Sequence, residues 1–198
     1  MTIVLGLTGS IGMGKSTVSA MFRQAGVPVF DADATVHALQ GPGGRLLAAI
    51  EAMHPGTTNA AGVDRVALGR IVLGDKAALH RLERLIHPAV EREKRRFLRR
   101  HRGRRLVVLD IPLLLEKGGW RRVDAIAVVS AAAWQQSRRV LARPGMSAAR
   151  LARIRALQMG DPEKRRRADF VIPTGCTHDE TRAVIRRIVA CLSAAAKR

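Results

Sequence analysis

A glycine-rich stretch near the start of the chain has the residue types and the spacing of a phosphate-binding loop. Gly9 is followed, after four residues, by Gly14, Lys15 and Ser16, which is the spacing of a P-loop. Glycines have no Cβ, so such a loop can adopt positive φ and bring backbone N–H groups against phosphate oxygens. The lysine supplies a point charge for the β- and γ-phosphates, and the serine hydroxyl can ligate Mg²⁺. The chemistry predicted here is the binding of a polyphosphate.

The neighbouring segments supply the strand and the helix that a P-loop requires. Residues 3–7 form an apolar run that predicts a buried strand, and residues 17–25 are compatible with a helix that opens at about Gly14. The first turn of that helix directs its positive dipole end at the same anion. An ordinary glycine-rich turn is the alternative, and the strand–loop–helix context favours the P-loop. The predicted nucleotide-binding residues are Gly12, Met13, Gly14, Lys15, Ser16 and Thr17.

Further short apolar runs predict the rest of a sheet. They are separated by helical segments and lie at residues 27–30, 106–110, 125–129 and 170–172. Continuous apolar strands alternating with helices are typical of a parallel sheet that is covered on both faces. The sequence therefore predicts an α/β fold of the P-loop NTPase type, a three-layer sandwich with a parallel five-stranded sheet.

The segments between strands two and three are helical in pattern. Residues 41–63 indicate a surface connection with a possible helix at 45–53, and residues 64–100 are strongly helical. Pro88 predicts that one helix ends at His87 and another begins there, because proline disfavours helix in the preceding residue and suits a first turn. The apolar stripe expected before this break consists of Leu79, Leu82, Leu85 and Ile86.

The last helix has a start signal and a buried face. Thr177 and Glu180 have the spacing of a capping box, in which each side chain satisfies a free backbone N–H of the first turn. The apolar positions that follow recur at helical spacing, and they are Val184, Ile185, Ile188, Val189 and Leu192.

Composition limits the classes of partner. Lysine and arginine total 35 against 16 acidic residues, a formal net charge of +19. This excess indicates either an anionic partner, nucleic acid or polyphosphate, or simply basic solvated faces. Only 3% of residues are aromatic and tyrosine is absent, which argues against a stacking platform for single-stranded nucleic acid. We expect no nucleic-acid partner.

The same composition predicts a cytoplasmic protein without a membrane span. No apolar stretch approaches the 18 residues of a spanning helix, and the start of the chain leaves no room for a signal peptide. Cys176 and Cys191 do not have metal-ligand spacing, and we expect them to be small buried or half-buried thiols in a reducing compartment. A monomer or a weak homo-oligomer is expected.

Acidic residues follow two of the predicted strands. Asp31 and Asp33 come after residues 27–30, at the end of a strand where open α/β sheets place ligands. Asp31 could also cap the following helix, and Asp33 would share a helix face with His37, four residues on. Asp110 ends the third strand as a metal-holding acid would, and the alternative is an ordinary turn acid.

The late part of the chain, from Gln136 to Arg167, is rich in arginine. On a helix, Gln136, Arg139 and Arg143 would lie on one face. In small kinases an arginine-bearing lid closes over ATP, excludes water and neutralises the charge that develops on the transferred phosphoryl group. The alternative is an exposed pair of basic helices. The P-loop favours the lid, and the absence of an Asn-Lys-x-Asp motif argues against a guanine-nucleotide switch.

Together these motifs make the chain resemble the dephospho-CoA kinase family over nearly its whole length. The matching segments are Leu7–Thr17, Asp31-Ala-Asp33 with His37, His87-Pro88, Asp110-Ile-Pro-Leu-Leu-Leu-Glu116, Gln136-x-x-Arg139-x-x-x-Arg143, Gln158, and Ala168–Ile172 with Gly175. The chain departs from the family pattern at Met13 and at Pro173-Thr174. We expect the first to be tolerated and the second to alter a contact near the adenine.

The resemblance implies a reaction and an architecture. The reaction is the phosphorylation of the ribose 3′-hydroxyl of dephospho-CoA by ATP with Mg²⁺, the last step of coenzyme A synthesis. The architecture is one domain over residues 1–198 in three parts: a P-loop core (1–36, 104–137 and 168–198), a helical part that binds dephospho-CoA (37–103) and a lid (138–167).

The resemblance also implies roles for individual residues. Asp33 would accept the proton of the 3′-hydroxyl, and Lys15, Arg139 and Arg143 would hold the phosphates. Ser16 and Asp110 would serve the metal, the latter through a water molecule. Three further residues have open roles: Glu116 could support the substrate-binding helices or the metal, and His37 and His87 could contact substrate or be structural.

Two other functions stay open at this stage. One is another P-loop nucleoside monophosphate or small-molecule kinase. The other is a nucleic-acid-binding P-loop protein. The net charge of +19 supports this alternative, and the lack of a recognition helix or an aromatic platform argues against it.

Overall fold

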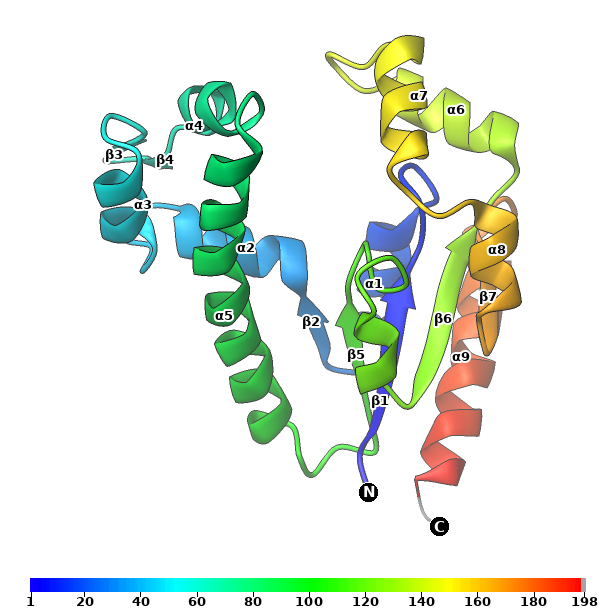
Figure 1. The fold of residues 1–198 in the computed structure, drawn as a ribbon. Coiled ribbons are helices and arrows are strands. Elements are labelled where there is room, and N and C mark those ends of the chain that lie inside the picture. The colour runs from blue at the N-terminus through cyan, green and yellow to red at the C-terminus, as the bar shows by residue number, and fades with distance from the viewer. Residues whose placement is uncertain (197–198) are drawn as a thin grey trace. The chain divides into compact units, whose positions relative to one another are not determined.

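The structure, a computed structural model, describes residues 1–196 of the chain. Five strands form one sheet: β1 (Ile3–Thr8), β2 (Val29–Asp31), β5 (Leu106–Asp110), β6 (Ala125–Ser130) and β7 (Phe170–Pro173). Their order across the sheet is β2-β5-β1-β6-β7 (Figure 1). Strands β5 and β6 both pair with β1 in the parallel sense, and β7 pairs with β6 in the same sense. This confirms the predicted α/β fold with a parallel five-stranded sheet.

The chain divides into two compact units, which are described separately. Unit 1 comprises residues 1–30 and 101–198, and unit 2 comprises residues 31–100. Unit 1 contains the sheet with helices α1 (Lys15–Gln24), α6 (Ala133–Leu141), α7 (Ala148–Ala156), α8 (Asp161–Arg166) and α9 (His178–Ala195), and the 3₁₀ turn η1 (Gly119–Arg122). The predicted boundaries of core, substrate-binding part and lid remain predictions.

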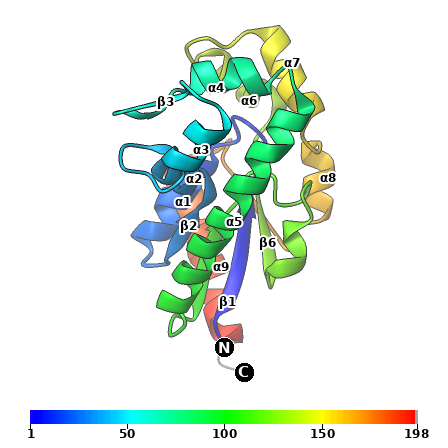
Figure 2. The same ribbon diagram turned by 60° about the vertical axis from the view of Figure 1, so that its left-hand side comes forward.

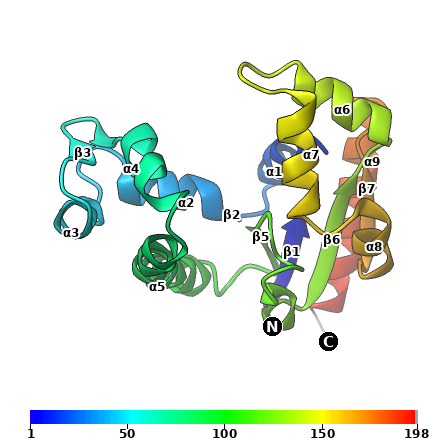
Figure 3. The same cartoon turned by 45° about the horizontal axis from the view of Figure 1, so that its top comes forward.

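Both faces of the sheet are buried, as the continuous apolar strands predict. Alternate residues of a strand point to opposite faces, and β6 follows this pattern. Ala125, Ala127 and Val129 belong to a core formed with α1 and α9. Ile126 and Val128 pack on the opposite face against Leu114 and Leu115, from the segment that follows β5. Helix α8 lies on the opposite face of the sheet from α9 (Figure 3). Strand β6 is therefore buried on both faces, whereas the edge strand β7 has exposed residues.

Two aspartates fix the register of the parallel strands at their amino-terminal ends. Asp124, just before β6, accepts a hydrogen bond of 2.8 Å from the Val4 N–H and donates its own N–H to the Val4 carbonyl at 2.9 Å. Asp169, just before β7, does the same with Ile126, at 2.8 and 3.0 Å. We call Asp124 and Asp169 the register locks, because a slip by one residue would break both bonds of each pair.

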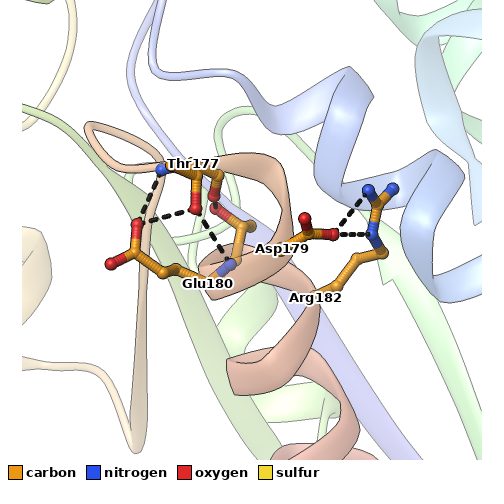
Figure 4. A network of polar contacts seen from close by, with 5 residues as sticks. Thr177, Asp179, Glu180 and Arg182 are labelled. Carbon is orange, nitrogen blue, oxygen red and sulfur yellow. Dashed lines mark hydrogen bonds and ion pairs between the residues drawn. The ribbon is translucent and has the colours of Figure 1, made fainter.

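Helix α9 starts at the predicted capping box. Glu180 accepts hydrogen bonds of 2.8 Å from the Thr177 N–H and from the Thr177 hydroxyl, and its own N–H is bonded to the Thr177 hydroxyl oxygen at 3.3 Å. These hydrogen bonds lower the pKa of the Glu180 carboxyl. Asp179 pairs with Arg182 one turn on (Figure 4). The predicted stripe is confirmed, since Ile185, Ile188 and Leu192 are buried and the other two members pack against the same core.

Unit 2 is built on one long helix. Its elements are α2 (Ala32–Gln40), α3 (Leu47–Met53), the short strands β3 (Thr58–Asn59) and β4 (Gly62–Val63), α4 (Arg65–Val72) and α5 (Lys76–Arg100). Helices α2 and α4 pack against α5 (Figure 2). The sequence predicts a surface connection over residues 41–63, and the hairpin β3–β4 within it is a difference from that prediction.

Helix α5 corrects the prediction of a break at Pro88. It runs without interruption through His87 and Pro88. A proline inside a helix costs about 3 kcal/mol, but buried residues lie on both sides of it, at Leu82 and Ala89. Leu85, Ile86 and Val90 pack against the same core as Leu82, and because a fully buried large apolar side chain contributes about 1.5–3 kcal/mol, the packing of these residues together outweighs the cost of Pro88. The prediction that Leu79 belongs to the buried stripe is also wrong, because this residue is 39% exposed.

The two cysteines also differ from the prediction. Both Cys176 and Cys191 are exposed. Cys176 lies in the connection between β7 and α9, and Cys191 precedes the buried Leu192 on α9, so its side chain points away from the core. A thiol is small enough for either environment, and composition does not distinguish them.

Replacing Pro88 by alanine should stabilise the protein. The change restores a backbone N–H in the helix interior and removes an unfavourable residue, a gain of about 3 kcal/mol, from which about 1 kcal/mol is lost because the unfolded chain becomes more flexible. We expect the free energy of unfolding to rise by about 2 kcal/mol, measured by urea unfolding followed by circular dichroism.

The matched control is Pro162→Ala. Pro162 lies in the first turn of α8, where proline is compatible with the helix, so this change should bring no gain. Equal effects of the two substitutions would show that Pro88 carries no helix penalty in this fold.

Candidate active site

The loop between β1 and α1 has the backbone of an anion cradle. Gly12 and Gly14 have φ of 76° and 87°, a region that only glycine occupies at low cost. Gly14 is the residue before the first turn of α1, so the free N–H groups of that turn face the loop. At Gly12 a Cβ would collide with the side chain of Val140 on α6. Glycine is therefore required here for packing as well as for backbone geometry.

Lys15 and Asp110 meet at the carboxyl end of the sheet. The Lys15 ammonium donates to Asp110 Oδ1, and the Ser19 hydroxyl donates to Asp110 Oδ2. The Asp110 side chain is 1% exposed and that of Lys15 is 17% exposed. A buried carboxylate needs such partners, because desolvation otherwise makes its charged form costly. The structure thus brings together two of the predicted site residues, from α1 and from the end of β5.

Ser19 is a member of this cluster that sequence reasoning missed. It lies four residues after Lys15, and residues at that spacing share a helix face. This spacing was the signal that could have found it. Ser16, the predicted metal-binding hydroxyl, and Thr17 are both exposed at the start of α1.

The oxygens available here fit a magnesium ion held mainly by its substrate. Mg²⁺ keeps several waters and uses one or two protein oxygens together with phosphates. The exposed Ser16 hydroxyl is free to serve as such a ligand, whereas both oxygens of Asp110 already accept hydrogen bonds. Residues 1–196 contain no cluster of three or more histidine, cysteine or acidic side chains able to hold a metal by themselves.

Thr174 joins the loop to Arg139. Its hydroxyl donates to the Met13 carbonyl at 2.6 Å, and its own carbonyl accepts from Arg139 Nη2 at 2.6 Å. Arg139 Nη1 also reaches the Thr174 hydroxyl oxygen at 3.3 Å. The departure from the family pattern at Thr174 therefore lies in direct contact with the P-loop.

Arg143 does not lie on the helix face predicted for it. Helix α6 ends at Leu141, so Gln136 and Arg139 lie on α6 and Arg143 does not. Its side chain is exposed. The helix ends before Arg143 because Pro144 disfavours helical geometry in the residue that precedes it, and Gly145 then turns the chain with φ of 71°, two signals that the spacing argument did not include.

Glu116 forms a buried ion pair with the base of the predicted lid. Its Oε1 lies 2.9 Å from Lys164 Nζ on α8 and accepts the Met159 N–H at 3.0 Å. Lys164 is fully buried. Burial by itself raises the pKa of the Glu116 carboxyl, but the adjacent charge of Lys164 and the hydrogen bond from Met159 outweigh it and hold the pKa below its ordinary value. These contacts join Glu116 to the predicted lid, and its role toward the substrate-binding helices or the metal stays a prediction.

The remaining predicted residues lie on helices of unit 2. Asp31 caps α2 by accepting the Ala34 N–H at 2.9 Å, as predicted. Asp33 is in the first turn of α2 and is exposed, and no hydrogen bond or ion pair with another part of residues 1–196 engages its carboxylate. The ring of His37, one turn on, contacts the Arg65 guanidinium. His87 is exposed in the middle of α5.

Comparison with known proteins decides the family. The sequence profile described as "Dephospho-CoA kinase" matches residues 3–179. The chain belongs to the dephospho-CoA kinase family. A dephospho-CoA kinase from Novosphingobium aromaticivorans is 58% identical over 186 residues, which is 94% of this chain and 92% of the relative. Members of this family are phosphotransferases. The two alternative functions kept open above gain no support from these matches.

Solved structures agree with the fold. A crystal structure of a protein from Thermus thermophilus superposes with a TM-score of 0.83 at 35% identity and covers 96% of this chain and 97% of its own. The dephospho-CoA kinase from Campylobacter jejuni has a TM-score of 0.68 at 20% identity, with the same coverage. Among the described residues no helix is both long enough and apolar enough to cross a membrane.

Glu116→Gln should make stability less dependent on pH. A carboxyl whose pKa is lowered by folding contributes stability above its unfolded pKa, and this contribution is lost as the pH falls through the folded pKa. At pH 7 we expect the variant to be about 2 kcal/mol less stable, because Lys164 loses its buried partner charge. The difference from wild type should narrow as the pH falls below 4.5, the ordinary value for this group.

Urea unfolding at pH 7 and at several acidic pH values measures this difference. Glu163→Gln is the matched control, because Glu163 forms a largely exposed pair with Arg167, a type of contact that contributes about 0–1 kcal/mol. If the loss of stability in Glu116→Gln is the same at every pH, the ion pair does not account for it.

Proposed function

We propose that this chain transfers the γ-phosphoryl group of ATP to the ribose 3′-hydroxyl of dephospho-CoA and so completes coenzyme A. The observation that carries the proposal is the family match over residues 3–179, a span that contains the two left-handed glycines and Lys15. The reaction forms a bond between the 3′-oxygen and the γ-phosphorus, breaks the bond to the β–γ bridging oxygen, and releases ADP and one proton.

The P-loop would bind the triphosphate. Its backbone N–H groups and the first turn of α1 present positive charge to the phosphate oxygens. Lys15 is held at this end of the sheet by Asp110, and its ammonium would turn to the β- and γ-phosphates when ATP enters. A phosphate-bound Lys15 would leave Asp110 with the Ser19 hydroxyl as a donor.

Magnesium would be held by the substrate and by Ser16. When bound, the ion neutralises charge on the transferred phosphoryl group. Ser16 would supply a direct oxygen ligand, and Asp110, whose Oδ2 accepts from the Ser19 hydroxyl, would act through a water molecule.

Arg139 and Arg143 are proposed to hold the phosphates from the lid side. Arg139 is partly buried and oriented by Thr174, which keeps the guanidinium in place before ATP binds. Arg143 is exposed beyond the end of α6 and would reach the nucleotide when residues 138–167 close over it. Closure excludes water, which strengthens these contacts and prevents hydrolysis of ATP.

Asp33 is proposed as the group that takes the proton from the 3′-hydroxyl. Its carboxylate is exposed at the start of α2 and is not used by a neighbouring side chain within the described part of unit 2, so it is available to a substrate. Unit 2 would carry the dephospho-CoA, with His37 and His87 as further substrate contacts. The family's name supports this substrate, and we place the reaction in the cytoplasm, performed by a monomer or a weak homo-oligomer.

A direct assay tests the proposed function. Purified protein, ATP and Mg²⁺ are incubated with dephospho-CoA, and the position of the new phosphate is determined by phosphorus NMR. AMP, CMP and shikimate serve as competing acceptors in an ATP-consumption assay. We expect phosphate on the 3′-oxygen and turnover with dephospho-CoA alone. Turnover with another acceptor but not with dephospho-CoA would contradict the proposal.

Asp33→Asn should lower kcat by about 10²-fold or more, which is what a positioned general base contributes. The change preserves shape and removes the basic oxygen, so KM for ATP should stay near that of wild type. Steady-state kinetics with dephospho-CoA measure both constants.

Asp179→Asn is the control for this substitution. Asp179 is 91% exposed in the first turn of α9 and pairs with Arg182, as Figure 4 illustrates. Its replacement should leave kcat unchanged. Near-normal turnover of the Asp33→Asn enzyme would mean that a different group accepts the proton.

A further inference from the structure

Two glutamines hold a single residue of the P-loop. The Ile11 N–H donates to Gln158 Oε1 at 3.0 Å, and Gln136 Nε2 donates to the Ile11 carbonyl at 2.8 Å. Ile11 lies between Gly9 and Gly12, so its two hydrogen bonds hold the backbone of the loop just before the left-handed Gly12. We call Gln136 and Gln158 the Ile11 clamp.

The two glutamines lie before and after helix α7 in the chain. Gln136 is on α6, just before the predicted lid begins, and Gln158 is within the lid, two residues after α7 ends. The residues are 125 and 147 positions away from Ile11 in the chain. The clamp therefore joins the glycine loop to the start of the segment that is proposed to close over ATP and to a residue inside that segment.

Arg155 on α7 connects the two halves of the clamp. Its Nε and Nη2 donate to Gln136 Oε1 at 3.0 and 2.6 Å, and Nη2 also reaches the Ser137 hydroxyl oxygen at 2.9 Å. The Gln136 side chain is buried, with 5% exposed. Because its oxygen accepts from Arg155, its nitrogen must face Ile11, so the lid helix α7 fixes the orientation of this amide.

Hydrogen bonds add to close packing where the lid meets the loop. The closest packing is at Gly12, where the side chain of Val140 leaves no room for a Cβ. Beside this contact, an open pocket of about 790 Å³ is lined by Gln136, Arg155 and Gln158 together with Ser10 and Met13 of the loop. Along this pocket, polar contacts link the α7 part of the lid to the loop.

We propose that Gln136 and Gln158 are positioning residues for phosphoryl transfer, which hold the Ile11 peptide groups in register with the seated lid. The P-loop then presents its N–H groups to the phosphates in the geometry of the transition state only when α7 is in place. Misplacement of such groups by about 1 Å can lower the rate by about 10²-fold. This inference rests on the proposed function, since it assumes that ATP binds to the loop.

The polarity of the clamp gives a test with isosteric variants. Gln158 acts on Ile11 as an acceptor, so Gln158→Glu keeps the bond, whereas Gln158→Leu leaves the Ile11 N–H without a partner. Gln136 acts on Ile11 as a donor, so Gln136→Glu loses the bond and places a carboxylate against a carbonyl oxygen while keeping Arg155. The same substitution is thus expected to be harmless at one position and harmful at the other.

The experiment measures kcat and KM for ATP and for dephospho-CoA in these three variants. Gln158→Leu and Gln136→Glu should lower kcat/KM for ATP by about tenfold, the effect of leaving one partly buried polar group unpaired, with KM for dephospho-CoA unchanged. Gln158→Glu should remain within about twofold of wild type. Gln24→Leu and Gln24→Glu are matched controls, because Gln24 is an exposed glutamine at the end of α1.

Several results would overturn the inference. It fails if Gln158→Glu is as impaired as Gln158→Leu, if Gln136→Glu retains wild-type kinetics, or if the loss appears only in KM for dephospho-CoA. Should Gln158→Leu not fold, the comparison of the two glutamate variants still decides, since both keep the shape of glutamine. If the glutamines only stabilise the fold, each variant should lose melting temperature in proportion to its loss of activity. Thermal unfolding of the variants without ligands measures this.

The test separates this inference from the proposed function. If the wild-type protein does not phosphorylate dephospho-CoA, the proposed function fails. The clamp is then still measured by calorimetric titration of the same variants with ATP and Mg²⁺. Weaker ATP binding in Gln136→Glu but not in Gln158→Glu would support it, and equal binding in both would contradict it.

Discussion

The contact between the Lys15 ammonium and the Asp110 carboxylate ties the glycine loop to the centre of the sheet. Asp110 ends β5, which pairs directly with β1, and its side chain is almost fully buried. A carboxylate in that position is tolerable only with donors around it. Lys15 and Ser19 supply them from successive turns of α1, so the requirement of one acid fixes the rotation of the helix about its axis. The helix dipole lies along the axis and is unaffected by this rotation, but the rotation sets the direction in which Lys15 and Ser16 leave the first turn, and the proposed phosphate site depends on that direction.

Much of the sheet and the loop could be predicted from the sequence because their signals are local. Each strand is a continuous apolar run, and the P-loop is defined by glycines within eight residues. The errors arose where distant packing decides. Pro88 lies inside a helix because residues on both of its sides are buried, and the partners of Ile11 are more than a hundred positions away. No spacing rule along the chain detects such pairs.

The distribution of acids explains part of the large positive charge. Many of the 16 acidic residues perform structural tasks that a neutral or basic side chain could not. They cap helices, as Asp31 and Asp64 do, close the box at the start of α9, or balance a buried cation, as Glu116 does. The net positive charge therefore reflects the small number of acids, which are kept at structural positions, as well as the anionic substrates that we propose. Neither charge nor composition alone distinguishes these causes.

The register locks Asp124 and Asp169 lie at the rim of the sheet opposite to the nucleotide end. Each forms a two-way bond with the neighbouring strand before that strand begins. The contacts that fix the alignment of these strands thus lie at one rim of the sheet, and the loops at the other rim are not needed to fix it. An engineer could exchange those loops, or open the chain there by circular permutation, and still expect the strands to pair correctly.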